Sequence, residues 1–158
     1  MKLFSPSEIL EFAVTLEENG KKFYEHAAGV SEDNKTQKAF EFLANEETEH
    51  KHTFKEMLSK ITDYEPIDSY PEDYFSYLKA YVDNTIFSPT VFQEKIEDIQ
   101  DALSAIDFAL QAEKDSIIYY QELKKFVSES QHDILENIID EERAHYSKLS
   151  DLKKDMKA

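Results

Sequence analysis

The chain contains no cysteine, and among its 158 residues it has only two glycines and four prolines. Without cysteine it cannot form a disulfide, a thiolate nucleophile, a zinc finger or an iron–sulfur site. Any metal must therefore be bound by oxygen and nitrogen atoms. The scarcity of glycine and proline, together with abundant Leu, Ile, Phe, Glu, Lys and Ala, favours long helices over sheets with tight turns. We therefore predict an all-α protein.

Positive charge is scarce as well. The chain carries 18 lysine and arginine residues against 34 aspartates and glutamates, a formal net charge of −16, with the acids spread along its length. Phosphate backbones and anionic lipid would be repelled, so we expect neither nucleic acid nor a membrane as a partner. No apolar run approaches the roughly 20 residues of a membrane span, and the start "MKLFSPSEIL" has no run of signal-peptide length. We expect a cytoplasmic protein.

Hydrophobic periodicity predicts four long helices in one domain that spans residues 1–158. Ser5, Pro6 and Glu8 supply the N-cap, the first helical position and the capping box of the first helix. The third helix is expected to begin near Asp98 or Asp101. The approximate helix ranges are 6–29, 33–61, 100–127 and 131–156.

The crossover of residues 62–99 is rich in Tyr and Phe and holds three of the four prolines, in "DYEPIDSYPEDYFSYLKAYVDNTIFSP". This composition is too apolar for a flexible linker. We expect a short helix near residues 72–86 and a second helical piece that opens with Ser88 and Pro89. Together they are long enough to cross from one end of the bundle to the other and to cover its core.

Each predicted helix carries an apolar stripe with steps of three or four residues, and acidic or histidine residues fill its longer gaps of seven or eleven. The apolar or small members of the four stripes are Leu10, Ala13, Gly20, Tyr24 and Ala27; Phe40, Leu43, Phe54, Met57 and Ile61; Ile106, Leu110, Ile117 and Tyr120; and Leu135, Ile138, Leu149 and Leu152. The polar residues that fill the missing steps, in chain order, are Glu17, Glu47, His50, Glu113, Glu142 and His145. These six side chains should therefore face the core.

The second half of the chain repeats the plan of the first. "AVTLEENGKKFY" and "ALQAEKDSIIYY" share Ala, Glu and Tyr at matching places, and "EETEH" matches "EERAH" about 95 residues later. In an antiparallel hairpin, residues at the same height have their midpoint in the turn. Glu17 and Glu47 have their midpoint inside "VSEDN". Glu113 and Glu142 have theirs at the head of "VSESQHD". The four glutamates can therefore meet in one layer, roughly 22 Å from each turn.

Four buried carboxylates need neutralisation, because an uncompensated buried charge costs several kcal/mol at least. No lysine or arginine occupies a stripe position at this level, which leaves protonation or bound cations. Two divalent ions balance four carboxylates, and two neutral imidazoles complete the set without adding charge. Glu-x-x-His spacing places both side chains on one helix face. A Glu from each of two helices and Glu-x-x-His from each of the other two is the ligand set of dinuclear carboxylate bundles.

Four segments of this sequence carry a family resemblance: "LEENGKKFYEHAA", "FLANEETEH", "AEKDSIIYYQEL" and "IIDEERAHYSKL". They resemble the ferritin-like diiron superfamily and, within it, the rubrerythrin-like branch. The segments touch all four predicted long helices, about two thirds of the chain, and leave the crossover uncovered. The resemblance implies a ferritin-like four-helix bundle of two antiparallel hairpins with a long crossover. It also implies a cofactor of two iron ions, although manganese or zinc also fits such a site.

The resemblance further implies roles for single residues. The expected metal ligands are Glu17, Glu47, His50, Glu113, Glu142 and His145. Among these, Glu47 and Glu142 would bridge the two metals. Tyr24 and Tyr120 match tyrosines of the family that lie beside the ligands, and their hydroxyls can hydrogen-bond the ligand carboxylates.

Two departures from rubrerythrins bear on the function. Rubrerythrins carry a C-terminal four-cysteine rubredoxin domain, whereas this chain has no cysteine, so we expect electrons from a separate donor such as a rubredoxin-like protein. Rubrerythrins also have a seventh carboxylate three residues after the ligand of the third helix, where this chain has Ser116. The remaining set of six ligands looks more like that of bacterioferritin.

The resemblance implies a non-haem diiron oxidoreductase of the rubrerythrin type, a homodimer that reduces hydrogen peroxide or dioxygen. The alternative within the same fold is a ferroxidase that oxidises iron for storage or detoxification. A third possibility, from a different class, is an acidic helical interaction module that binds no metal.

Structural interpretations of the same residues also stand. The four glutamates would be surface residues if the helices were slightly rotated, and Tyr24 and Tyr120 would be core aromatics whose hydroxyls find a partner. The acids next to the expected ligands are interpreted as solvated neighbours; they are Glu18, Glu46 and Glu141. The histidines off the predicted face or near a helix start are interpreted as surface residues; they are His26, His52 and His132.

Overall fold

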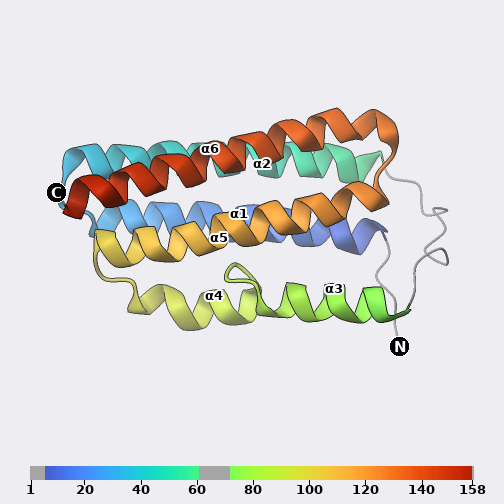
Figure 1. Ribbon diagram of the computed structural model, residues 1–158, viewed down its shortest axis with the longest axis horizontal. Coiled ribbons are helices and arrows are strands. Elements are labelled where there is room, and N and C mark those ends of the chain that lie inside the picture. The colour runs from blue at the N-terminus through green and yellow to red at the C-terminus, as the bar shows by residue number, and fades with distance from the viewer. Residues whose placement is uncertain (1–5, 61–71, 158) are drawn as a thin grey trace.

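Two antiparallel helical hairpins form the bundle (Figure 1). The structure is a computed structural model that describes residues 6–60 and 72–157. In the first hairpin α1 (Pro6–Val30) pairs with α2 (Asn34–Ser59), and in the second α5 (Ala102–Leu123) pairs with α6 (His132–Lys157). The described elements are all helical, which confirms the predicted all-α class.

Side chains close the turn of each hairpin. Asp33 caps α2, since its carboxylate accepts a hydrogen bond of 3.0 Å from the backbone N–H of Thr36. In the second hairpin, Nε2 of His132 lies 2.9 Å from the carbonyl oxygen of Lys124. His132 is half-buried rather than a surface residue, because its ring ties the start of α6 to the 3₁₀ turn that follows α5.

The helix ends differ slightly from the predicted ranges. Asp101 accepts a hydrogen bond of 2.8 Å from the backbone N–H of Ser104, so Asp101, and not Asp98, is the N-cap of α5. The α-helix ends at Leu123, and a 3₁₀ turn over Lys124–Phe126 continues it. The predicted N-cap Ser5 and the stripe residue Ile61 lie outside the described residues.

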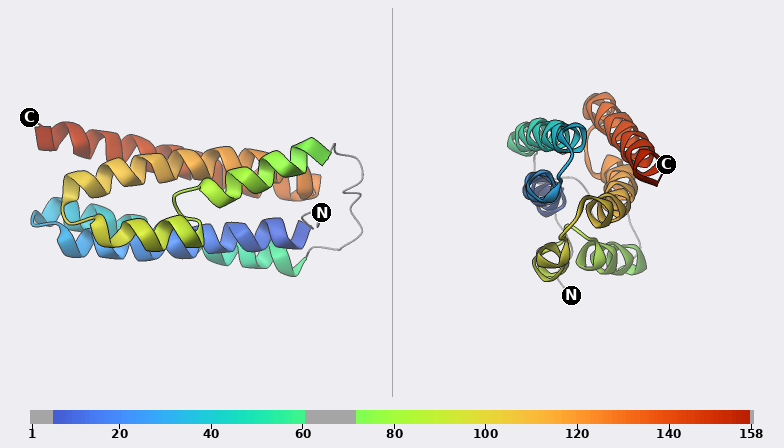
Figure 2. Two further views of the ribbon diagram at one scale, coloured as in Figure 1. Left: turned by 90° about the horizontal axis from the view of Figure 1, so that it is seen from below. Right: turned by 90° about the vertical axis from the view of Figure 1, so that its left-hand side faces the viewer.

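The crossover forms a second layer beside the bundle. Its helices α3 (Glu72–Asn84) and α4 (Pro89–Lys95) run back along the bundle, from the end where α2 stops to the end where α5 begins, and they lie against α1 and α5 (Figure 2). Ser88 caps α4, as the sequence predicted. The side chains that this layer adds to the core are Leu78, Val82, Phe87, Phe92 and Ile99. These contacts confirm that the aromatic crossover covers the core.

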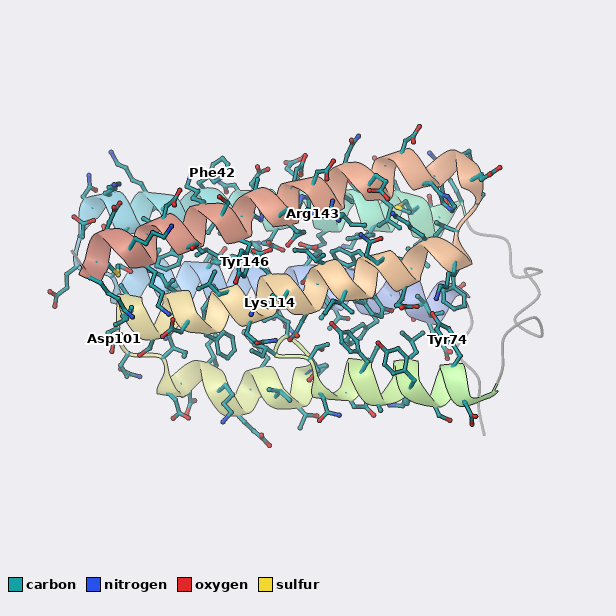
Figure 3. The ribbon with its side chains drawn as sticks, in the orientation of Figure 1. Phe42, Tyr74, Asp101, Lys114, Arg143 and Tyr146 are labelled. Atoms are coloured by element: carbon teal, nitrogen blue, oxygen red, sulfur yellow. The ribbon has the colours of Figure 1, made fainter. Side chains whose placement is uncertain are left out.

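Polar contacts fasten the crossover to the bundle. Tyr74 of α3 points toward α5 (Figure 3), where its hydroxyl donates to Glu122. On the other hairpin, Nε2 of His26 in α1 lies 2.7 Å from the carbonyl oxygen of Ile99, just after α4. His26 is half-buried, so the prediction of a surface histidine is wrong here too. His52 is exposed, as predicted.

Three of the four predicted stripes are buried as expected in their described residues, but the buried face of α5 differs from its predicted stripe. Leu110 and Ile117 are only half-buried, whereas the buried surface of α5 centres on Ala109, Ala112, Ser116 and Tyr119. The reason is that α5 packs against α6 and α1 and also carries the crossover layer, so its buried face is wider than one stripe. None of the described helices is long and apolar enough to cross a membrane.

Asp115 of α5 holds the segment between α3 and α4. Its carboxylate accepts hydrogen bonds of 3.0 Å from the backbone N–H of Ile86 and from the side chain of Gln111, and its carbonyl oxygen accepts one of 2.6 Å from Tyr81. Asp115→Ala should destabilise the protein by about 1–3 kcal/mol, because it leaves the half-buried N–H of Ile86 unpaired. Urea unfolding measures the change. Gln111→Ala, which removes only an exposed partner, is the control; equal effects of the two variants would contradict the anchoring role.

Candidate metal centre

Four glutamates, one from each long helix, converge in one buried layer. Glu17, Glu47, Glu113 and Glu142 lie on α1, α2, α5 and α6, and each is at most 3% exposed. Their positions follow from the stripes, because each occupies a step that an apolar residue would otherwise fill. The interpretation of these glutamates as surface residues is wrong.

Two groups of ligand atoms share this layer. Within each group, the four candidate ligand atoms lie within 4.8 Å of one another. The first group is Glu17, Glu47, His50 and Glu142, and the second is Glu47, Glu113, Glu142 and His145. Glu47 and Glu142 belong to both groups, which is the arrangement that two bridging carboxylates require. Each group also contains one histidine and one glutamate of its own.

Both histidines point Nδ1 toward the carboxylates. Nδ1 of His50 lies 2.7 Å from Oε1 of Glu142 and 3.5 Å from Oε2 of Glu17. Nδ1 of His145 lies 3.5 Å from Oε1 of Glu113. The two rings are nearly parallel, with centroids 5.8 Å apart, so the imidazoles flank the layer from one side.

Two buried tyrosines hydrogen-bond the outer carboxylates. The hydroxyl of Tyr24 donates to Oε1 of Glu113 at 2.5 Å, and the hydroxyl of Tyr120 donates to Oε1 of Glu17. Each bond crosses from one hairpin to the other. Burial and the neighbouring carboxylates raise the pKa of both phenols well above the ordinary value, so both hydroxyls keep the proton that they donate. The tyrosines are therefore core aromatics and also partners of the acidic cluster.

Several buried polar atoms of the cluster form no hydrogen bond. Among the described residues, six buried side-chain atoms lack a partner in hydrogen-bonding geometry, including the two atoms of the close His50–Glu142 pair. They are Oε2 of Glu17, Nδ1 of His50, Oε2 of Glu113, Oε1 of Glu142, and Nδ1 and Nε2 of His145. Buried polar atoms without partners are rare in proteins. Five of the six belong to carboxylates or to the nitrogens that face them. A pair of metal ions within the layer fits these atoms.

Without metal, bound protons reduce the negative charge of the cluster. Burial and the other carboxylates raise the pKa values of Glu47 and Glu142 well above the ordinary range. Burial alone would lower the pKa of His145, but the carboxylates around it raise it to about 11, and they raise the pKa of His50 as well. Burial would also raise the pKa of Glu113, but Glu142 and His145 next to it lower it. The metal-free layer therefore holds protons that bound cations would displace.

The absence of a side chain at Gly20 leaves room for the Glu47 carboxylate. A Cβ atom on Gly20 would lie 3.1 Å from Oε2 of Glu47 and 3.2 Å from Cε2 of Phe87. Both contacts are tighter than ordinary van der Waals distances. The glycine, which sequence analysis assigned only to an apolar stripe, therefore lets α1 pass close to a shared carboxylate.

The acids next to the cluster are not all solvated bystanders. Oε2 of Glu141 lies 2.5 Å from Nε2 of His50, although the Glu141 side chain is half exposed. Glu18 forms an ion pair of 2.5 Å with Lys51, and Glu46 is 3.9 Å from Nε2 of His145. Glu141 is exposed, as interpreted, but it also contacts His50, whereas Glu18 is half-buried beside Lys51. The sequence offered one signal for the contacts of these acids with the histidines: Glu46 and Glu141 occupy matching places in "EETEH" and "EERAH".

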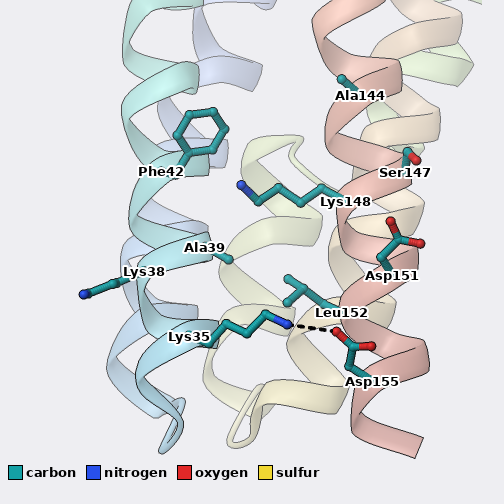
Figure 4. Close-up of a pocket in the computed structure, with 10 residues that line it drawn as sticks. All are labelled: Lys35, Lys38, Ala39, Phe42, Ala144, Ser147, Lys148, Asp151, Leu152 and Asp155. Carbon is teal, nitrogen blue, oxygen red and sulfur yellow. Dashed lines mark hydrogen bonds and ion pairs between the residues drawn. The ribbon is translucent and has the colours of Figure 1, made fainter. Parts of the chain in front are cut away.

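A groove of about 620 Å³ opens elsewhere between α2 and α6 (Figure 4). Lys35, Phe42 and Lys148 are among the residues that line it, and an ion pair of 3.1 Å between Lys35 and Asp155 spans it. None of the six clustered residues lines this groove. The candidate chemistry therefore lies in the buried layer.

Comparison with known proteins agrees with this geometry. The family description "Rubrerythrin" matches residues 8–153, which is most of the chain. The chain belongs to the rubrerythrin family. No curated protein matches the chain.

A solved structure extends the comparison to the fold. A Thermotoga maritima protein, described as a candidate ferritin-like diiron-carboxylate protein, is 27% identical and superposes with a TM-score of 0.72. The match covers 98% of this chain and 97% of the other. The predicted ferritin-like bundle is thus confirmed. Ser116 is buried three residues after Glu113. At this place we expect a further carboxylate in rubrerythrins, so this member of the family departs from that pattern.

Metal removal should make stability depend on pH. Groups whose pKa is raised by folding, here Glu47, Glu142 and both histidines, stabilise the metal-free protein below their unfolded pKa values, and this contribution is lost as pH rises. Glu113, with its lowered pKa, is ionised in both states above pH 6 and adds no slope there.

The melting temperature of the chelated protein should therefore fall between pH 6 and pH 9, by about 2–4 °C for each kcal/mol lost. Metal-loaded protein should melt higher throughout this range and should depend less on pH, because the metals replace the protons. Calorimetry at several pH values measures both forms. Identical curves after confirmed metal loss would show that the acids do not hold the metal.

Gly20→Ala should weaken metal binding on the order of 10-fold, because the added methyl group displaces the Glu47 carboxylate. Gly29→Ala is the matched control, since a Cβ at Gly29 meets nothing within 4 Å. It should leave metal affinity unchanged and stabilise α1 by about 1 kcal/mol. Competition with a chelator of known affinity measures binding. Equal affinity of the two variants would rule out this role for Gly20.

Proposed function

We propose that the chain is a non-haem diiron oxidoreductase that reduces hydrogen peroxide or dioxygen with electrons from a separate donor. The observation that carries the proposal is the sharing of Glu47 and Glu142 by two groups of ligand atoms, each completed by one histidine. Shared carboxylates favour a pair of ions over two independent sites. Membership of the rubrerythrin family supports the redox chemistry.

The proposed ligand set fits iron by its chemistry. Glu17 and His50 would hold one ion, Glu113 and His145 the other, and Glu47 and Glu142 would bridge them. Four carboxylates balance the charge of two divalent ions, while the neutral imidazoles add none. Oxygen-rich sets of this kind with imidazole suit iron and manganese, and zinc can occupy them. Among these metals, iron and manganese can undergo redox change, which the proposed reaction requires.

The reaction needs two electrons and two protons. Hydrogen peroxide takes both pairs as its O–O bond breaks, which yields two molecules of water. Two ferrous ions bound in the layer would supply one electron each. A separate protein, such as a rubredoxin-like donor, would restore these electrons, because the 158 residues include no cysteine for a rubredoxin-type iron centre. We propose a homodimer as the working assembly.

The chain's own residues position the ligands and exclude water. Tyr24 and Tyr120 fix the orientation of the outer carboxylates through their hydroxyls. Aromatic rings pack beside these tyrosines. The ring centroids of Phe54 and Tyr120 are 4.9 Å apart, and those of Phe40 and Tyr24 are 6.1 Å apart. A layer sealed in this way strengthens the electrostatic interactions within it.

Ser116 supports a second candidate function, that of a ferroxidase. It leaves six candidate ligands, and a buried hydroxyl at this place cannot supply the negative charge of a carboxylate. Oxidation of added ferrous ion by dioxygen or hydrogen peroxide would then be the main reaction, and it would serve storage or detoxification of iron. Storage requires a hollow shell, so sedimentation distinguishes a shell from the proposed dimer. Absence of bound metal would instead support an interaction module.

Glu47→Ala combined with Glu142→Ala should abolish binding of both ions, because the two substitutions remove every shared oxygen. The exposed glutamates Glu41 and Glu49 of α2 provide the control pair, and their joint replacement by Ala should leave two ions per chain. Elemental analysis after desalting measures the stoichiometry. Two ions retained by the Glu47/Glu142 variant would exclude these residues as bridges.

The diferrous protein should react faster with hydrogen peroxide than with dioxygen in stopped-flow mixing. If the missing carboxylate limits this preference, Ser116→Glu should raise the peroxide rate, whereas Ser116→Gln, which is similar in size but neutral, should not. Equal or faster reaction with dioxygen, together with turnover of added ferrous ion, would favour the ferroxidase.

A further inference from the structure

The two ring nitrogens of His50 have different surroundings. Nδ1 faces the buried carboxylates, 2.7 Å from Oε1 of Glu142. Nε2 points the other way and lies 2.5 Å from Oε2 of Glu141. Neighbouring residues of α6 therefore contact opposite sides of one imidazole of α2. Glu142 is fully buried, whereas the side chain of Glu141 is half exposed.

This contact determines which nitrogen can bind a metal. When Nε2–H donates to the Glu141 carboxylate, the free lone pair of a neutral imidazole is on Nδ1. Nδ1 is the nitrogen that belongs to the buried layer. A carboxylate behind a histidine ligand also fixes the plane of the ring and makes it a better ligand.

The internal repeat places a second glutamate in the equivalent position. Glu46 precedes Glu47 as Glu141 precedes Glu142. Its Oε1 lies 3.9 Å from Nε2 of His145, and that nitrogen has no hydrogen-bond partner among the described residues. The Glu46 side chain is 29% exposed, so it has room to change its torsions and come closer.

We infer that Glu141 is a positioning residue that orients His50 for metal binding, and that Glu46 does the same for His145. Each hairpin would thus orient the histidine ligand of the other. This inference rests on the proposed metal centre and adds to it two residues that bind no metal themselves. Both histidine–glutamate pairs join α2 to α6, so the contact between these two helices would serve to orient the ligands.

Titration of the metal-free full-length chain with Co²⁺ tests the inference, because the visible absorption of Co²⁺ reports on its ligands. Glu141→Ala should lower the affinity of one of two Co²⁺ ions by roughly 10–100-fold and leave the other nearly unchanged. Glu141→Gln should show an intermediate loss, because the amide oxygen still accepts from Nε2–H but carries no charge. Glu46→Ala should likewise weaken one ion.

Glu49→Ala is the control for charge alone. It removes an exposed acid beside His50 in the sequence and should leave both affinities unchanged. A double-mutant cycle gives the sharper control: in a His50→Ala background, Glu141→Ala should cause no further loss, because its partner is gone.

The inference would be overturned if Glu141→Ala bound both Co²⁺ ions as tightly as Glu49→Ala, or if its effect persisted without His50. If the unmodified chain bound no Co²⁺, the proposed metal centre itself would fail. The two failures are therefore distinguishable.

Discussion

Four carboxylates share one buried layer at mid-height in this bundle, and they cannot all remain ionised there without positive charge between them. Protons meet this need in part, as the raised pKa values of Glu47 and Glu142 indicate. Two divalent ions would meet it in full. Metal binding would then be coupled to folding, because the burial that suits the glutamates to bind metal also makes the layer costly without cations.

The rest of the architecture keeps this layer closed and in register. Tyr24 and Tyr120 each reach across from one hairpin to a carboxylate of the other, so the cluster joins the hairpins by hydrogen bonds as well as by packing. The α3–α4 layer covers α1 and α5, and Phe87 from this layer packs near both Gly20 and Phe23. Asn19 donates to the carbonyl oxygen of Phe87 at 2.7 Å, which fixes this contact two residues after Glu17.

The layer itself could be predicted from sequence because it follows from periodicity and symmetry. A helical stripe places Glu17 and Glu113 on the inner face, and the midpoint of each glutamate pair falls in its turn, so helix geometry alone brings them together. Both observations depend only on spacing along the chain. The cap at Ser88 could likewise be predicted from neighbouring residues, whereas the start of α5 was narrowed only to Asp98 or Asp101.

What escaped prediction depends on contacts between distant segments. The buried face of α5 also includes Ala109, Ala112 and Ser116, which lie outside the predicted stripe, because the crossover packs on a second side of that helix. The roles of His26 and His132 depend on carbonyl groups that only the fold brings near. Glu141 is half exposed and would pass for a surface acid by any pattern, and the close approach of Gly20 to Glu47 requires the actual distance between α1 and α2.

A paired metal site is the central claim, and anomalous diffraction from crystals of the iron-loaded protein tests it most directly. The account predicts two iron peaks per chain, about 3.5–4 Å apart, in the buried layer between Glu47 and Glu142. A single peak, or peaks only at surface carboxylates, would contradict it.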